Sequence, residues 1–89
     1  MGDSIIKVAS SSSVKSVAGS IVKSYEDGAS KVEMTAIGAG AVNQAVKSIA
    51  MARGFLSAKG RDLYVAPGFD TVTIGGAPRT SIRFVLKVF

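Results

Sequence analysis

The 89-residue chain contains no cysteine and no histidine. Without cysteine there is no disulfide, no thiolate nucleophile and no cysteine-ligated metal. Without histidine, the side chain that serves most often as a general base and as a metal ligand is missing as well. Without cysteine and histidine, the chain lacks two of the side chains that enzymes use most often for catalysis.

Acidic residues are also few and scattered, and only Glu26 and Asp27 are adjacent. The six carboxylates are Asp3, Glu26, Asp27, Glu33, Asp62 and Asp70. No serine has a histidine partner for nucleophilic catalysis, and no cluster of metal ligands occurs. The sequence therefore predicts a protein that is not an enzyme and that holds no cofactor and no metal.

Long apolar runs are missing. The longest uncharged segment, residues 34–46, is interrupted by Asn43, Gln44 and small residues. It is too short and too polar to span a bilayer, and the first residues carry no signal core. We expect a cytoplasmic protein with no membrane partner, for which association with the nucleoid is an option.

Positive charge and apolar residues are what the chain has in excess. Eleven dispersed lysines and arginines give a net charge of +5. This charge favours anionic partners, nucleic acid before membrane surfaces, although solubility alone explains it too. Hydrophobic residues make up 47% of the chain. They indicate either a homo-oligomer that covers leftover apolar surface or a tight core rich in alanine and valine.

The first half of the chain predicts a strand, a helix and a second parallel strand. Residues 4–9 favour a short strand, and residues 31–37 alternate between apolar and polar positions. Between them, apolar residues recur with helical spacing over residues 14–25. That stripe consists of Val14, Val17, Ala18, Ile21, Val22 and Tyr25.

A second helix is expected from about Ala41 to Arg53, with Gly54 as its C-cap. Its predicted apolar stripe is Val42, Ala45, Val46, Ile49 and Ala52, after which Phe55 and Leu56 pack back on the core.

The last third predicts β-structure, with a bend at Pro67-Gly68 and a turn at Gly75-Gly76. The expected extended segments are residues 63–66, 71–74 and 80–89. The whole chain thus predicts one α/β domain over residues 1–89, of the α+β two-layer type. Its order is β-α-β-α-β-β, with two helices on one face of a mixed four-stranded sheet.

The two strand–helix junctions are the best candidates for a binding site. Backbone N–H groups after Gly38-Ala39-Gly40 lie at a helix N-terminus, where an anion can sit. In the first junction, Ser12 or Ser13 caps the helix, or the serine hydroxyls contact phosphate. A dinucleotide fingerprint fails because Asn43 takes the place of the third glycine, and the chain has no phosphate-loop GK[ST] motif.

Basic residues accompany these junctions. Lys15 begins the first helix, and Lys47 lies on the outer side of the second. Arg79 lies at the tip of the predicted hairpin, and Arg83 and Lys87 follow along the same strand. Each one alone is explained as a solvated charge, whereas their joint layout suits nucleic-acid phosphates.

The sequence TAIGAGAVNQAVKSIAMARGF, residues 35–55, closely resembles the stage V sporulation protein S family. The segments IKVASSSSVKSVAGSI and ARGFLSAKGRDLYVAPGF extend the resemblance over nearly the whole chain. That family is similar to the Alba-type group, which implies the same β-α-β-α-β-β order. The resemblance also implies a homodimer that binds nucleic acid through Ser10–Lys15, Gly38–Lys47 and Ile74–Arg79, and a role in regulating spore development.

One departure from the Alba pattern concerns charge. Alba-type proteins carry paired lysines in the first junction and an arginine in the second, whereas this chain has four serines followed by Lys15, and then Ala39 and Gly40. Fewer cations predict weaker binding that depends less steeply on salt. A single strand or a smaller anion is therefore an alternative to chromatin coating.

The leading hypothesis is a dimeric Alba-like protein that binds DNA or RNA and regulates development or gene expression. Its candidate contacts are Ser11, Ser13, Lys15, Gly38, Ala39, Gly40, Asn43, Lys47, Arg79, Arg83 and Lys87. The main alternative is a protein-interaction or scaffold module without nucleic-acid affinity. A third is a small-anion sensor that uses the glycine turn.

Overall fold

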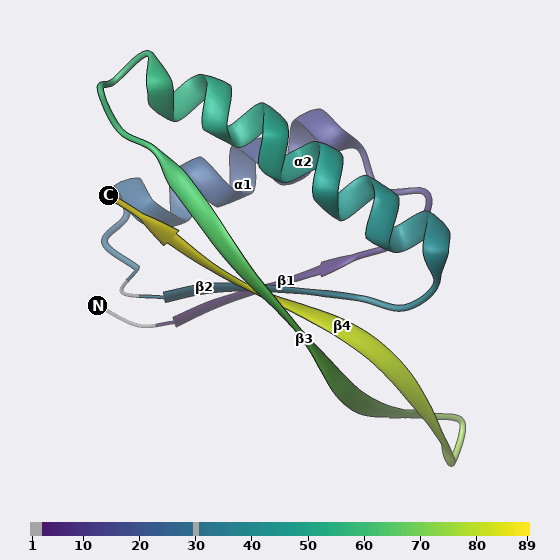
Figure 1. The fold of residues 1–89 in the computed structure, drawn as a ribbon. Helices are drawn as coiled ribbons and strands as arrows, with labels where there is room; N and C mark the ends of the chain where they lie inside the picture. Colours follow the sequence, from purple (N-terminus) through teal and green to yellow (C-terminus); the bar gives the residue numbers. More distant parts are fainter. Residues whose placement is uncertain (1–2, 30) are drawn as a thin grey trace.

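The computed structural model describes residues 3–29 and 31–89. Its elements are β1 (Asp3–Val8), α1 (Val14–Glu26), β2 (Lys31–Ala36), α2 (Ala39–Ser57), β3 (Leu63–Ile74) and β4 (Ala77–Val88). The strands form one sheet in the order β1-β2-β4-β3, in which β1 and β2 are parallel and the other neighbours antiparallel. Both helices cover one face of this sheet (Figure 1), which confirms the predicted fold class. Neither described helix has the length and apolarity needed to cross a membrane.

The first helix begins where the periodicity predicts. Ser13 is its N-cap, and the Ser13 hydroxyl accepts a hydrogen bond of 3.2 Å from the N–H of Ser16. The Ser12 hydroxyl instead accepts from the N–H of Ala9 at 2.9 Å and closes the preceding turn. The buried stripe consists of Val17, Ala18, Ile21 and Val22. Of the two predicted caps, Ser13 is therefore the one that the structure uses.

The second helix is longer than predicted. It continues through Gly54, the predicted C-cap, to Ser57. Glycine inside a helix costs about 1 kcal/mol relative to alanine. Leu56, however, is only 4% exposed, and burial of a leucine side chain contributes about 1.5–3 kcal/mol. Burial of Leu56 outweighs the cost of the glycine, and the helix ends only where Lys59 and Arg61 donate their N–H groups to the Leu56 carbonyl.

The buried face of α2 also differs from the predicted stripe. It consists of Ala41, Ala45, Ser48, Ile49, Ala52 and Leu56. Val46 is 52% exposed and Phe55 is 43% exposed, so the prediction that both pack inward is wrong. Small residues take the inner positions because the helix lies close to its neighbours. Ser48 is tolerated there because its hydroxyl donates to the carbonyl of Gln44 at 2.7 Å.

The β3–β4 hairpin is a single long arm rather than a bent pair of segments. All residues from Leu63 to Ile74 pair with β4, including Pro67 and Gly68, where a bend is predicted. Proline is compatible with this position because β3 is an edge strand. The hairpin turns at Gly75-Gly76 and extends beyond the helices (Figure 1).

The end of α2 is fastened to the start of β3. The Arg53 guanidinium donates Nε to Oδ1 of Asp62 at 2.8 Å and Nη2 to Oδ2 at 3.0 Å. These hydrogen bonds, together with one from the Leu63 N–H, hold the pKa of Asp62 at about 2. Asp62 and Phe89 exchange two backbone hydrogen bonds of 2.9 Å, which ties the chain's last strand to the same loop.

The core lies between the sheet and the helices. Its largest fully buried side chains are Ile21, Met34, Leu86 and Val32. Tyr25 packs at the margin of this core, and its hydroxyl donates to the carbonyl of Leu86. Burial raises the pKa of Tyr25 to about 12.

The two strand–helix junctions contact each other. A Cβ added at Gly40 would lie 2.9 Å from the Cβ of Ser10, closer than two carbon atoms can approach without a shift. The Gln44 side-chain amide donates to the carbonyl of Ser12 at 2.9 Å. Gly40 and Gln44, both on α2, therefore hold the first junction against the second.

We expect the free energy of unfolding to fall as the pH rises from about 10 to about 12. In this window the unfolded chain loses the Tyr25 proton, whose ordinary pKa is 10.0, while the folded chain still retains it. The stabilisation that comes from the raised pKa of Tyr25 is therefore complete below pH 10 and is lost by about pH 12. Urea unfolding of the wild type and of Tyr25→Phe at several pH values measures it. Parallel profiles for the two proteins would contradict it.

The contact between Gly40 and Ser10 predicts opposite effects for two glycine substitutions in α2. Gly54→Ala should raise the free energy of unfolding by about 0.5–1 kcal/mol, because a Cβ there meets nothing within 4 Å. Gly40→Ala gains the same helix propensity but forces Ser10 aside, so we expect a net loss of about 1 kcal/mol. Chemical denaturation measures both, and equal stabilisation by the two alanines would disprove close packing of the junctions.

Candidate nucleic-acid interface

Both strand–helix junctions lie at the same end of the molecule. The strands β1 and β2 are adjacent and parallel, so their carboxyl ends point the same way. Figure 1 shows the loops after these two strands side by side, away from the C-terminus and the α2–β3 loop. Their contact through Gly40 and Gln44 joins them into one surface.

The N-terminus of α2 has no side-chain cap. Gly38 is its N-cap residue, with a φ of 89° that residues with a side chain rarely adopt, and no side chain accepts from the first turn. The first hydrogen bond of the helix runs from the Val42 N–H to the Gly38 carbonyl. The N–H groups before Val42 therefore have no partner within the helix, and Ala39 and Gly40 are exposed. An anion is stabilised at such a helix end.

The serine run of the first junction serves mainly its own turn. Ser13 caps α1, Ser12 closes the turn on Ala9, and Ser10 packs against Gly40. Ser11 is exposed at the turn. Of the two candidate serines, Ser11 is thus the one whose hydroxyl is not committed to a described hydrogen bond.

Exposed polar side chains follow both helix starts. Lys15 lies in the first turn of α1. Asn43 and Lys47 lie on α2 four residues apart, so they share one exposed face of that helix. Asn43 lies about one turn and Lys47 about two turns beyond the helix end described above.

The hairpin arm faces the ends of β1 and β2 across a groove of about 460 Å³. Lys7 and Thr35 line the sheet side of this groove, and Val72 and Thr73 line the arm side. Arg79 lies directly opposite Val72 on β4. The sequence analysis missed Lys7 and Thr35, although strand alternation already places both on the side opposite the core.

Arg83 and Lys87 occupy different places. Arg83 pairs in register with Thr35, which itself pairs with Lys7, so the three residues form a row across the uncovered face of the sheet. Its guanidinium lies 3.9 Å from a carboxylate oxygen of Asp70. Lys87 lines a cavity at the opposite end of the molecule, so the structure does not bring it together with the junctions.

Acidic residues are distributed unevenly among the basic ones. The described ion pairs engage Lys23, Lys31, Arg53, Lys59 and Arg83. Within residues 3–29 and 31–89, no such pair involves Lys7, Lys15, Lys47 or Arg79. The cations near the junctions and the arm thus stay uncompensated in the described part of the chain.

Known proteins resemble this chain in sequence and in fold. Residues 4–89 match the profile of the family described as stage V sporulation protein S (SpoVS). Among solved structures, Alba from Thermoplasma volcanium superposes with a TM-score of 0.64 and 18% sequence identity, over 92% of this chain and 96% of that chain. At this identity the likeness concerns the fold. The family match covers nearly every residue, and the chain belongs to the stage V sporulation protein S family.

Proposed function

We propose that this protein is a dimeric nucleic-acid-binding protein that regulates spore development or gene expression. The proposal is supported by an uncapped helix N-terminus at the end of the molecule that holds both junctions, together with four cations that take part in no described ion pair. Lys7 lines the groove under the arm, Lys15 and Lys47 lie on the two helices, and Arg79 lies on the arm. Membership of the stage V sporulation protein S family supports the developmental role.

In this proposal the nucleic acid is held through its backbone. A phosphate lies at the start of α2 and accepts hydrogen bonds from the exposed N–H groups of the first turn. Lys47 and Lys15 neutralise neighbouring phosphates, and Arg79 carries the contact along the arm. Phosphate contacts position a duplex or a single strand without reading its sequence. The proposal therefore predicts weak sequence preference and covers both DNA and RNA.

The dimer part of the proposal rests on apolar surface left open on the helix side of the sheet. Phe69 is 83% exposed, an unusual state for a phenylalanine. It lies opposite Ile82, which packs against the core cluster, and with Pro67 these residues line a groove of about 240 Å³. Val46 on α2 is also exposed. A second copy that covers these residues would also double the number of phosphate-facing cations.

The alternative of an interaction or scaffold module draws on the same exposed apolar residues. Unlike the nucleic-acid-binding proposal, it predicts that the protein self-associates but does not bind nucleic acid. The next two experiments therefore separate the two functions, because one measures binding and the other measures assembly.

Binding to a short DNA duplex and to RNA should weaken as salt rises. With about four phosphate-facing cations per protomer, we expect the logarithm of the affinity to fall with the logarithm of salt with a slope of about −3 to −4 for each contacting protomer, or about −7 for a dimer that binds with both. Lys47→Gln and Arg79→Gln should each reduce the magnitude of this slope by about 1 for each contacting protomer. The measurement is fluorescence anisotropy between 50 and 300 mM salt, a range over which the Debye length falls to less than about half.

The matched control is Lys87→Gln, which makes the same charge change at the opposite end of the molecule. It should leave the slope unchanged. If Lys87→Gln reduced the slope as much as Lys47→Gln does, net charge rather than this surface would attract the nucleic acid. Affinity that ignores salt, or no binding at all, would favour the scaffold alternative.

Substitution of Phe69 should disrupt the dimer. Phe69→Ser removes the most exposed aromatic side chain from the proposed contact, so we expect the dissociation constant for self-association to rise at least about tenfold. Sedimentation velocity over a concentration series measures this. Ile5→Thr is the control, because Ile5 is 65% exposed on the opposite, uncovered face of the sheet. A stronger effect of Ile5→Thr would place the interface there instead.

A further inference from the structure

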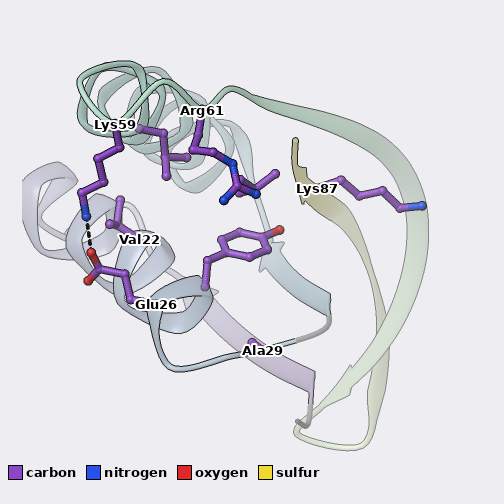
Figure 2. Close-up of a pocket in the computed structure, with 9 residues that line it drawn as sticks. Val22, Glu26, Ala29, Lys59, Arg61 and Lys87 are labelled. Atoms are coloured by element: carbon purple, nitrogen blue, oxygen red, sulfur yellow. Dashed lines mark hydrogen bonds and ion pairs between the residues drawn. The ribbon is translucent and has the colours of Figure 1, made fainter.

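A second hollow lies at the end of the molecule away from the junctions. It is formed by the last turns of α1, the loop between α2 and β3, and the end of β4 (Figure 2). Its volume is about 540 Å³, within the range of pockets that bind small molecules. Neither the proposed nucleic-acid surface nor the proposed dimer contact uses it.

The inner part of this cavity is apolar. Val22 and Leu56 line it from the core side, and Val88 and Ala29 complete the wall. The partly buried Tyr25 lines it too, and because its hydroxyl donates to the Leu86 carbonyl, the ring is fixed in place. A rigid apolar wall of this kind suits the planar or aliphatic body of a small molecule.

The mouth of the cavity carries positive charge. In Figure 2 the Arg61 guanidinium points into the hollow. Its Nε donates to the main-chain oxygen of Phe89 at 3.4 Å, and no described ion pair involves Arg61 or Lys87. Lys59, by contrast, is engaged by Glu26, so these two side chains form a wall without net charge. Of the three cations named in the wall, Arg61 alone is both directed inward and outside the described ion pairs, because Lys87 alternates with Val88 on β4 and its side chain lies on the uncovered face of the sheet.

We propose that this cavity binds a small organic phosphate monoester. The ester's body would rest against Val22 and Tyr25, and its phosphate would receive two parallel hydrogen bonds from the Arg61 guanidinium. A monoester carries a charge of about −1.5 to −2 near neutral pH, so the inward-pointing Arg61 guanidinium attracts its phosphate.

The site is separate from the proposed nucleic-acid surface, so the two can be tested independently. Titration calorimetry compares three compounds. Phenyl phosphate has a small organic group, adenosine 5′-monophosphate has a large one, and inorganic phosphate has none. We expect at least one ester to bind at least about tenfold more tightly than inorganic phosphate, because only the esters fill the apolar part. No ester binding at millimolar concentration, or equal affinity for inorganic phosphate, would overturn the proposal.

Three variants locate the binding. Arg61→Gln should weaken ester binding at least about tenfold, because it removes a charge-assisted pair of hydrogen bonds from an exposed side chain that the fold does not need. Ala29→Leu should weaken it by filling the cavity without a change in charge. Lys47→Gln, at the other end, should leave it unchanged. Circular dichroism and thermal unfolding verify that each variant is folded.

The outcomes are decisive in both directions. If Arg61→Gln lowers the affinity for the ester and Lys47→Gln does not, the result supports the site. Unchanged ester affinity in Arg61→Gln, or a loss confined to Lys47→Gln, overturns it and moves the anion to the start of α2. Because Arg61→Gln does not touch the core, a folding defect in Ala29→Leu would leave this comparison intact.

Discussion

The close approach of Gly40 to Ser10 is the contact on which the arrangement of the two strand–helix junctions depends. Parallel pairing of β1 and β2 brings the two junctions to one end of the sheet, but does not by itself press one against the other. That requires a residue without a Cβ at the first turn of α2, and the Gln44 amide then fastens the Ser12 carbonyl. The uncapped start of α2 is thereby held beside the first junction.

Charge is divided between the two ends of the molecule in different ways. At the end with the chain terminus, Arg53 and Lys59 pair with Asp62 and Glu26 and fasten loops to helices. At the junction end, the described cations have no carboxylate partner apart from Arg83 beside Asp70. Because an ion pair at the surface contributes little to stability, the difference matters more for what each end attracts than for how firmly the fold holds. One end is fastened by ion pairs that leave Arg61 out, and at the other end the described cations other than Arg83 have no carboxylate partner.

Sequence reasoning worked where a pattern has one physical cause. The stripe of α1 and the alternation of β2 follow from burial on one side, and both are present at the predicted residues. It failed at Gly54 and at Pro67-Gly68, because residues that usually end elements are tolerated when their neighbours are buried or when the strand is at an edge. The buried face of α2 was partly misplaced because valine is more hydrophobic than alanine or serine and so was expected inside, whereas the packed positions hold mainly small residues.

The amino-acid sequence by itself determined the order of the elements, the two-layer fold, a serine cap for the first helix at Ser12 or Ser13, and the excess of positive charge. These depend on local spacing and on composition, which a chain carries in any conformation. Only the tertiary structure decided which cations lie together. It placed Lys7 at the groove under the hairpin arm and Lys87 at the opposite end of the molecule. The reason is that strand register and the reach of a twisted hairpin set distances between residues far apart in the chain, and no local pattern encodes those distances.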